Sequence, residues 1–149
     1  MNTITLESGE SSFAIDYASY CCSDSERSWA VFARSDMHLV SRAAMDAIHR
    51  MTTPDSEGYY IRLTDFEVSL SKRRNGTLNL HIQGWGINFT SCEMTPDELA
   101  AVHAMTSPDN LDKLQADCEA EEARSQAEYE AEEIEQQRIA EEAAEAECQ

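Results

Sequence analysis

The sequence predicts an α+β fold in which an antiparallel sheet is built around one long, bent β-hairpin. Apolar residues alternate from Tyr59 to Thr90 on both sides of a glycine-containing turn. An apolar stripe at helical spacing precedes this segment and predicts one helix packed on the sheet. Two proline-containing helix starts follow it, and the last predicted helix ends in an acidic tail.

The parity of the apolar residues predicts how the hairpin turns. The residues that alternate nearest the turn are Phe66, Val68, Leu70, Leu78, Leu80 and Ile82. A two-residue Asn75-Gly76 turn would place Leu80 opposite Ser71, whereas a three-residue Arg74–Gly76 loop places it opposite Leu70. Because a slip of one residue moves every side chain to the other face, the three-residue loop is favoured, with Gly76 supplying the positive φ.

Farther from the turn both arms change parity at the same level, near Thr64-Asp65 and Gly84–Gly86. The same register still opposes apolar residues there, namely Leu63 with Ile87 and Ile61 with Phe89. Glycines allow a bend or a bulge at such a level. The sequence therefore predicts two continuous arms that bend together.

The chain before the hairpin is predicted to supply three more strands and a helix. Met1–Leu6 and Phe13–Tyr20 alternate and suit a hairpin, and the apolar run Trp29–Ala33 suits a central strand. Ser35 is the predicted cap of the helix, which ends before Pro54. The stripe of this predicted helix consists of Met37, Val40, Ala44, Ile48 and Met51.

After the hairpin, Thr95, Pro96 and Glu98 have the spacing of a capping box and predict a short helix, Pro96–Met105. Residues 1–106 are therefore the predicted α+β domain. Residues 107–149 are predicted to form an acidic helix rich in Ala and Glu, which is helical to about Tyr129 and frays or is disordered toward the C-terminus, because its carboxylates repel one another.

Charge is unevenly distributed along the chain. The 149 residues include 29 acidic and 11 basic ones, and residues 117–149 alone contain 13 acidic and two basic ones. A surface this acidic repels nucleic acid and anionic membranes, so we expect direct binding of neither. The five cysteines form no CxxC pair, and no apolar run has the length of a signal peptide core or a membrane span, which favours a cytoplasmic protein with reduced thiols.

No residue pattern predicts a catalytic, cofactor or metal site. The four histidines lack ligand or triad spacing, and Ser91 lacks the flanking glycines of a nucleophile elbow. We therefore expect no enzymatic activity. The basic hairpin tip, Lys72–Arg74, could contact phosphate or the chain's own acidic tail. The alternative is that the tip is simply solvated and protects the edge of the hairpin from aggregation.

The acidic tail is the main functional candidate, with simple solubilisation as the alternative. In charge and size the chain resembles small acidic inhibitors that imitate nucleic acid. That resemblance implies an inhibitor that binds the basic site of a nucleic-acid-handling protein. The predicted partner-binding residues are Glu121, Glu122, Glu128, Glu130, Glu132, Glu133 and Glu135.

A structural or assembly protein is the alternative function. In it the hairpin forms a homodimer and the tail is a solubilising spacer. The change of apolar face along the hairpin leads us to expect such a homodimer. The predicted interface residues are Phe66, Val68, Leu70, Leu80 and Ile82.

Overall fold

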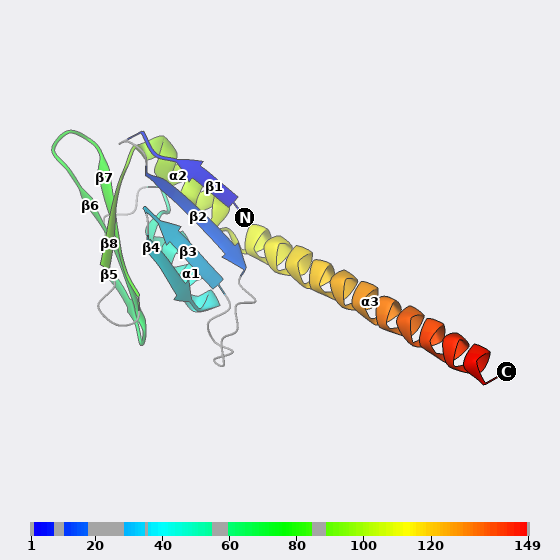
Figure 1. The fold of residues 1–149 in the computed structure, drawn as a ribbon. Coiled ribbons are helices and arrows are strands. Elements are labelled where there is room, and N and C mark those ends of the chain that lie inside the picture. Colours follow the sequence, from blue (N-terminus) through cyan, green and yellow to red (C-terminus); the bar gives the residue numbers. More distant parts are fainter. Residues whose placement is uncertain are drawn as a thin grey trace. The chain divides into compact units, whose positions relative to one another are not determined.

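The computed structural model describes residues 2–7, 11–17, 29–34, 36–54, 60–84 and 89–148. Within these ranges the chain forms two antiparallel four-stranded sheets and three helices, which confirms the α+β class (Figure 1). In chain order the elements are β1 (Asn2–Thr5), β2 (Ser12–Tyr17), β3 (Trp29–Ala33), β4 (Asp36–Val40), α1 (Arg42–Met51), β5 (Tyr60–Leu63), β6 (Phe66–Lys72), β7 (Leu78–Gln83), β8 (Phe89–Met94), α2 (Pro96–Met105) and α3 (Pro108–Glu147).

The predicted turn between β6 and β7 is confirmed. Leu70 lies opposite Leu80, and the backbone N–H of Arg73 donates to the carbonyl of Thr77 at 2.8 Å across the three-residue loop. Gly76 has a φ of 86°. The apolar pattern fixed this register because only the three-residue loop keeps the apolar residues of both strands on one face.

The prediction of one long, bent hairpin is wrong, because each of the two predicted arms folds into two strands. β5 turns back at Thr64-Asp65 and pairs with β6, which places Ile61 opposite Val68. β8 pairs with β7, which places Phe89 opposite Gln83 rather than Ile61. A two-residue turn changes the parity of buried positions just as a bulge does, so the pattern alone did not separate the two. Ile87 lies outside the described residues.

The predicted helix before the hairpin is shorter than expected. Residues Asp36–Val40 form β4, which pairs antiparallel with β3, and α1 begins only at Arg42. Ser41 is its N-cap, and its Oγ accepts from the backbone N–H of Ala44 at 3.2 Å. Met37 is 47% exposed and is no part of a helical stripe. Ser35, the predicted cap, lies outside the described residues.

The chain contains an internal repeat that the sequence analysis missed. Each half consists of four strands in meander order followed by a helix of 10 residues. The N-caps Ser41 and Thr95 are 54 positions apart. At the same spacing, Ala47–Pro54 (AIHRMTTP) matches Ala101–Pro108 (AVHAMTSP). The fold is therefore a duplicated ββββα unit.

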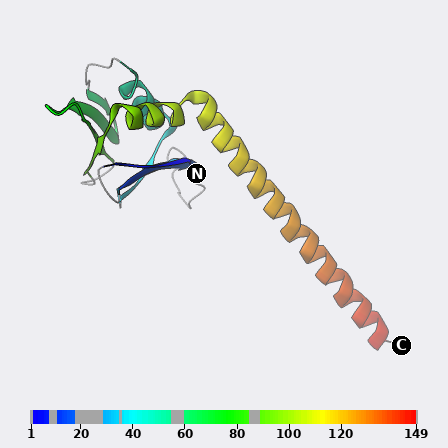
Figure 2. The same cartoon turned by 90° about the horizontal axis from the view of Figure 1, so that it is seen from above.

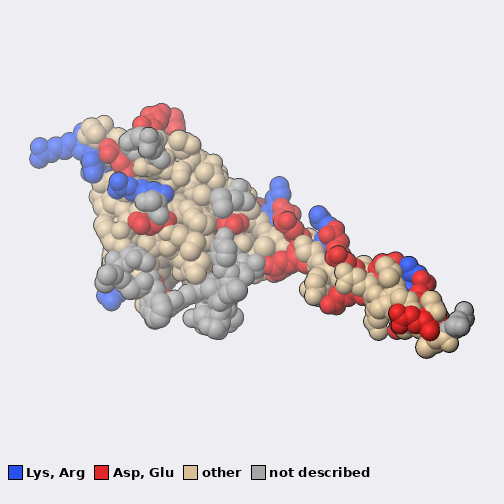
Figure 3. Space-filling model, in the orientation of Figure 1, with Lys and Arg blue, Asp and Glu red and all other residues tan. Residues whose placement is uncertain are grey.

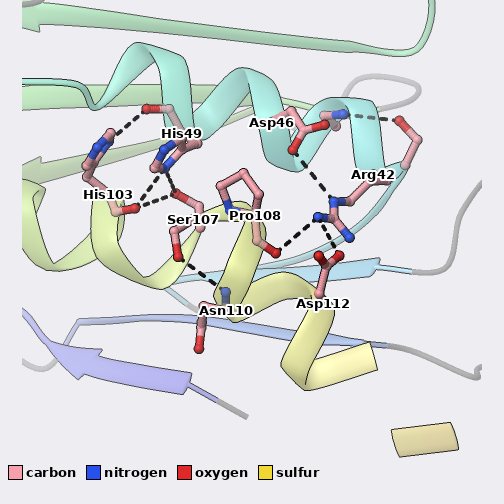
Figure 4. A network of polar contacts seen from close by, with 11 residues as sticks. Arg42, Asp46, His49, His103, Ser107, Pro108, Asn110 and Asp112 are labelled. Atoms are coloured by element: carbon pink, nitrogen blue, oxygen red, sulfur yellow. Dashed lines mark hydrogen bonds and ion pairs between the residues drawn. The ribbon is translucent and has the colours of Figure 1, made fainter. Parts of the chain in front are cut away.

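The two halves interlock through their helices. α1 contacts β5 and β6 of the second sheet, whereas α2 contacts β1 of the first. The equivalent residues His49 and His103 stack with ring centroids 3.9 Å apart, and Nδ1–H of each donates to the backbone carbonyl of the other, at 2.8 and 2.9 Å (Figure 4). Such reciprocal bonds make the halves one core rather than two separable domains.

The predicted dimer interface needs a correction, because its five side chains are buried within one chain. Phe66, Val68, Leu70, Leu80 and Ile82 belong to the hydrophobic core together with apolar residues of β2, β3 and α1. The change of apolar face that suggested an unpaired surface comes from the turn at Thr64-Asp65. A dimer that leaves this fold intact cannot use these side chains.

We expect Gly76→Val to destabilise the fold by about 1–2 kcal/mol, because a β-branched residue resists a positive φ. No atom lies within 4 Å of the added Cβ, so the cost is backbone strain and not a clash. Urea denaturation measures the change, and Asn75→Ser in the same loop is the milder control. A neutral Gly76→Val would show that the loop adopts another conformation in solution.

Candidate functional site: an acidic helical arm

The last helix joins two compact units of the chain, Met1–Leu114 and Gln115–Gln149. The first turns of α3 belong to the first unit, whereas the sequence pattern placed the domain boundary at residue 106. Leu111 is 0% exposed and lies in the core cluster, with Leu114 packed against it. Two leucines early in a charged segment were the signal that the core extends this far.

Polar contacts also hold the start of α3 in the first unit (Figure 4). Arg42 of α1 forms an ion pair with Asp112 at 3.0 Å and donates to the carbonyl of Pro108 at 3.3 Å. Asn110 Nδ2 donates to the carbonyl of Met105 at 2.6 Å, at the end of α2. The capping box of α2 is confirmed as well, since Thr95 and Glu98 exchange both bonds. The base of α3 is thus fixed to both earlier helices.

We call the second unit, Gln115–Gln149, the acidic arm. Through Glu147 it is one continuous helix (Figure 2). All seven predicted partner-binding glutamates lie on it, and all are exposed. Its large apolar residues are exposed too, including Ile134 at 68%. A helix with so few large apolar side chains has little surface to bury, so its stability has to come mostly from contacts along its own length.

Contacts between side chains one turn apart support the arm. Arg138 lies between Glu135 and Glu142, with N–O distances of 2.6 Å to both. Hydrogen bonds from Arg138 lower the pKa of Glu135 below its ordinary value. Gln126 donates to Glu130 at 3.1 Å in the same way. The helix therefore continues beyond Tyr129, where the sequence pattern placed the start of fraying.

Acidic side chains recur along the arm, separated by uncharged residues and a few basic ones (Figure 3). The arm contains 13 acidic and two basic residues. Successive helical residues point about 100° apart, so adjacent pairs such as Glu121-Glu122 and Glu132-Glu133 present charge in different directions. A basic surface can therefore contact carboxylates on several sides of the arm. Such a contact would depend on charge and not on the burial of apolar side chains.

Family models, curated proteins and solved structures give no match to this chain. The assignment of a site consequently rests on the chain's own geometry.

The basic hairpin tip is only partly free. Arg73 forms an ion pair with Glu93 at 3.6 Å. Lys72 and Arg74 are exposed. One of the three charges at the predicted tip thus has an ion-pair partner within the sheet.

His81, His38 and Cys92 have contacts or burial that suit a role in the fold rather than in catalysis. His81 lies between Ser71 and Ser91, with ring nitrogens 3.1 and 3.0 Å from their hydroxyls. His38 is buried beside Thr90, and burial lowers its pKa. Burial raises the pKa of Cys92 to about 11, so its thiol is neutral near pH 7 and is a poor nucleophile.

In the described part of the chain, no group of three or more His, Cys, Asp or Glu side chains could hold a metal ion. Among its helices, none combines the length and the apolar character that crossing a membrane requires.

We expect a peptide covering Asp117–Gln149 to become more helical as pH falls from neutral toward about 4, the range in which carboxyl groups protonate. Protonation removes repulsion between pairs such as Glu128 and Glu132. It also removes the contacts of Arg138 with Glu135 and Glu142, but 13 acidic residues against two basic ones make repulsion the larger effect. Circular dichroism measures the change. A peptide with glutamine at every glutamate is the control, and an unchanged signal in the parent peptide would contradict the expectation.

Proposed function

We propose that this protein is a non-enzymatic interaction protein whose acidic arm binds the basic site of a nucleic-acid-handling protein. One observation carries the proposal: the described arm is a continuous helix with exposed carboxylates and exposed large apolar residues. Its charge is therefore available to a partner. The charge of the arm best supports an inhibitor that competes with nucleic acid for that basic site.

The charge spacing along the arm is comparable to that of a single nucleic acid strand. At a rise of about 1.5 Å per residue the arm is roughly 50 Å long, which gives about one carboxylate per 4 Å. One DNA strand carries a phosphate about every 3.4 Å. A groove built to neutralise phosphates with Lys and Arg can thus meet the carboxylates at a similar density.

The alternative, an assembly protein that dimerises through its hairpin, loses its specific support. The five side chains that suggested it lie in the core of a single chain. The arm could also serve only to keep the chain in solution. The experiment below distinguishes that role from binding a partner.

The experiment compares three baits in a lysate of the source cells. They are the full chain, a chain that ends at Leu114, and a full chain with Glu→Gln at the seven predicted partner-binding positions. The third bait is the matched control, because it keeps the length of the helix and removes only charge. We expect basic nucleic-acid-binding proteins on the first bait alone, released by a single-stranded oligonucleotide.

For a captured protein, binding is then measured across a salt series. We expect the affinity for the full chain to fall steeply as salt rises, and the Glu→Gln chain to bind more weakly with a flatter dependence. Equal affinities for all three chains at every salt concentration would remove the arm from the mechanism and leave it a solubilising role.

A further inference from the structure

A small cavity in the first unit brings together side chains from both halves of the duplicated fold. Its volume is about 280 Å³. From the first half it is lined by Leu6, Ser11 and Arg34, and from the second by Arg73, Asn79 and Ser91. All described residues of this lining belong to the first unit, so the cavity is a separate candidate from the acidic arm.

Arg73 is held in a fixed orientation at this cavity. With the Asn79 amide turned so that its oxygen faces the guanidinium, Oδ1 accepts from Nη2 at 2.8 Å and from Nε at 2.9 Å. Glu93 lies 3.6 Å from Nη1 on the other side. Asn79 is only 8% exposed. These contacts involve all three nitrogens of the guanidinium. Each terminal nitrogen carries two N–H groups, so one donor on each is left for a ligand.

Arg34 lines the cavity with its backbone in the strained left-handed conformation. Its φ is 58°, and within the described residues it is the only non-glycine with a positive φ. Its backbone N–H donates to the carbonyl of Ser12 at 3.0 Å, which fixes it next to β2. Gly or Asn adopts this conformation more readily than Arg does. Among the described residues, no side chain forms a hydrogen bond or an ion pair with its guanidinium.

The charge of the lining favours an anion. Among the described residues that line the cavity, two guanidinium groups face one carboxylate, Glu93, in a chain whose net charge is −18. The hydroxyls of Ser11 and Ser91 add hydrogen-bonding groups, and Leu6 forms an apolar wall. A guanidinium fork matches the geometry of a carboxylate or a phosphate. We propose that this cavity, lined by Arg34 and Arg73, binds a small organic anion through its carboxylate or phosphate group.

Calorimetric titration of the full chain tests the proposal with two probes, inorganic phosphate and succinate, at constant ionic strength. We expect saturable binding of at least one probe below about 10 mM, the range of a weak single site. Saturation by phosphate alone assigns the ligand a phosphate group, and saturation by succinate alone assigns it a carboxylate. Saturation by neither overturns the proposal.

Arg34→Gly separates a binding role from a structural one. We expect it to raise the dissociation constant at least tenfold while the thermal midpoint stays the same or rises, because glycine relaxes the positive φ. Arg73→Gln is the second binding variant, with its thermal midpoint measured in parallel. Lys72→Gln removes a charge outside the cavity and is the matched control, with binding within twofold of the parent chain.

Three results of the variant series contradict the proposal. The first is an unchanged dissociation constant in Arg34→Gly. The second is a lower thermal midpoint in that variant, which would show that Arg34 stabilises the fold. The third is an equal loss of binding in Lys72→Gln, which would reduce the effect to general electrostatics.

Discussion

A chain that ends at residue 106 is expected to lose cooperative unfolding, whereas a chain that ends at Leu114 keeps the stability of the full protein. The shorter chain lacks Leu111, which is 0% exposed. It also lacks the bond from Asn110 to Met105 and the ion pair of Arg42 with Asp112. Removing a buried leucine side chain alone costs about 2–5 kcal/mol. That is a large part of the roughly 5–15 kcal/mol that stabilises a typical domain.

Urea denaturation followed by circular dichroism compares the two truncated chains with the full one. Leu111→Ala in the full chain is the control, and we expect it to cost about 2–5 kcal/mol by itself. Glu119→Ala, on the exposed arm, is the matched surface change and should stay within about 0.5 kcal/mol. A chain of residues 1–106 with the denaturation midpoint of the full protein would restore the earlier boundary.

Local rules predicted the local features of this fold. The register of β6 with β7 followed from alternating apolar residues and one glycine, and the capping box at Thr95 followed from residue types three positions apart. Both depend on interactions between near neighbours in the chain. The positions of β2, β3 and α2 were predicted for the same reason.

The errors arose where one pattern fits two structures. Met37 and Val40 have helical spacing with Ala44, but they lie on a strand before the helix. The parity change at Thr64 fits a bulge and a tight turn equally well, and pairing between β5 and β6 decided it. Tertiary pairing is not encoded in the spacing of one segment, so these choices were open at the level of sequence.

The repeat, in contrast, is visible in the sequence once His49 and His103 are aligned. Comparing the chain with itself at a spacing of 54 would have found it and would have predicted two ββββα halves. For the sites, segregated charge predicted the exposed arm. The pairing of Arg34 with Arg73 at one cavity was beyond reach, because two distant turns meet there only in the folded chain.

Gly84→Ala is expected to destabilise the fold by about 2–4 kcal/mol, from overpacking and from a disturbed buried hydrogen bond. A Cβ at this position would lie 2.8 Å from Nδ1 of His38, closer than real contacts allow. His38 is 3% exposed and cannot swing into solvent without leaving the core. Chemical denaturation measures the loss.

The contacts of His38 explain why it cannot yield. Thr90 Oγ1 donates its proton to Asp36 at 2.9 Å, so Nε2–H of His38 is the donor in the 2.8 Å bond to the same hydroxyl. Displacing the ring therefore leaves Thr90 with an unfilled acceptor in the core. This chain of bonds joins β4 to β8, the equivalent last strands of the two halves.

A double-mutant cycle isolates the clash from other effects of the added methyl group. In a His38→Ala background the ring is absent, so we expect Gly84→Ala to cost at least about 1 kcal/mol less than in the parent chain, a coupling typical of residues in contact. Gly76→Ala serves as the strain-only reference, because no atom lies within 4 Å of its Cβ and its φ of 86° is the only penalty. If the cost of Gly84→Ala is the same with and without His38, the imidazole does not set the space available at Gly84, and the packing of β4 against β8 would need another explanation.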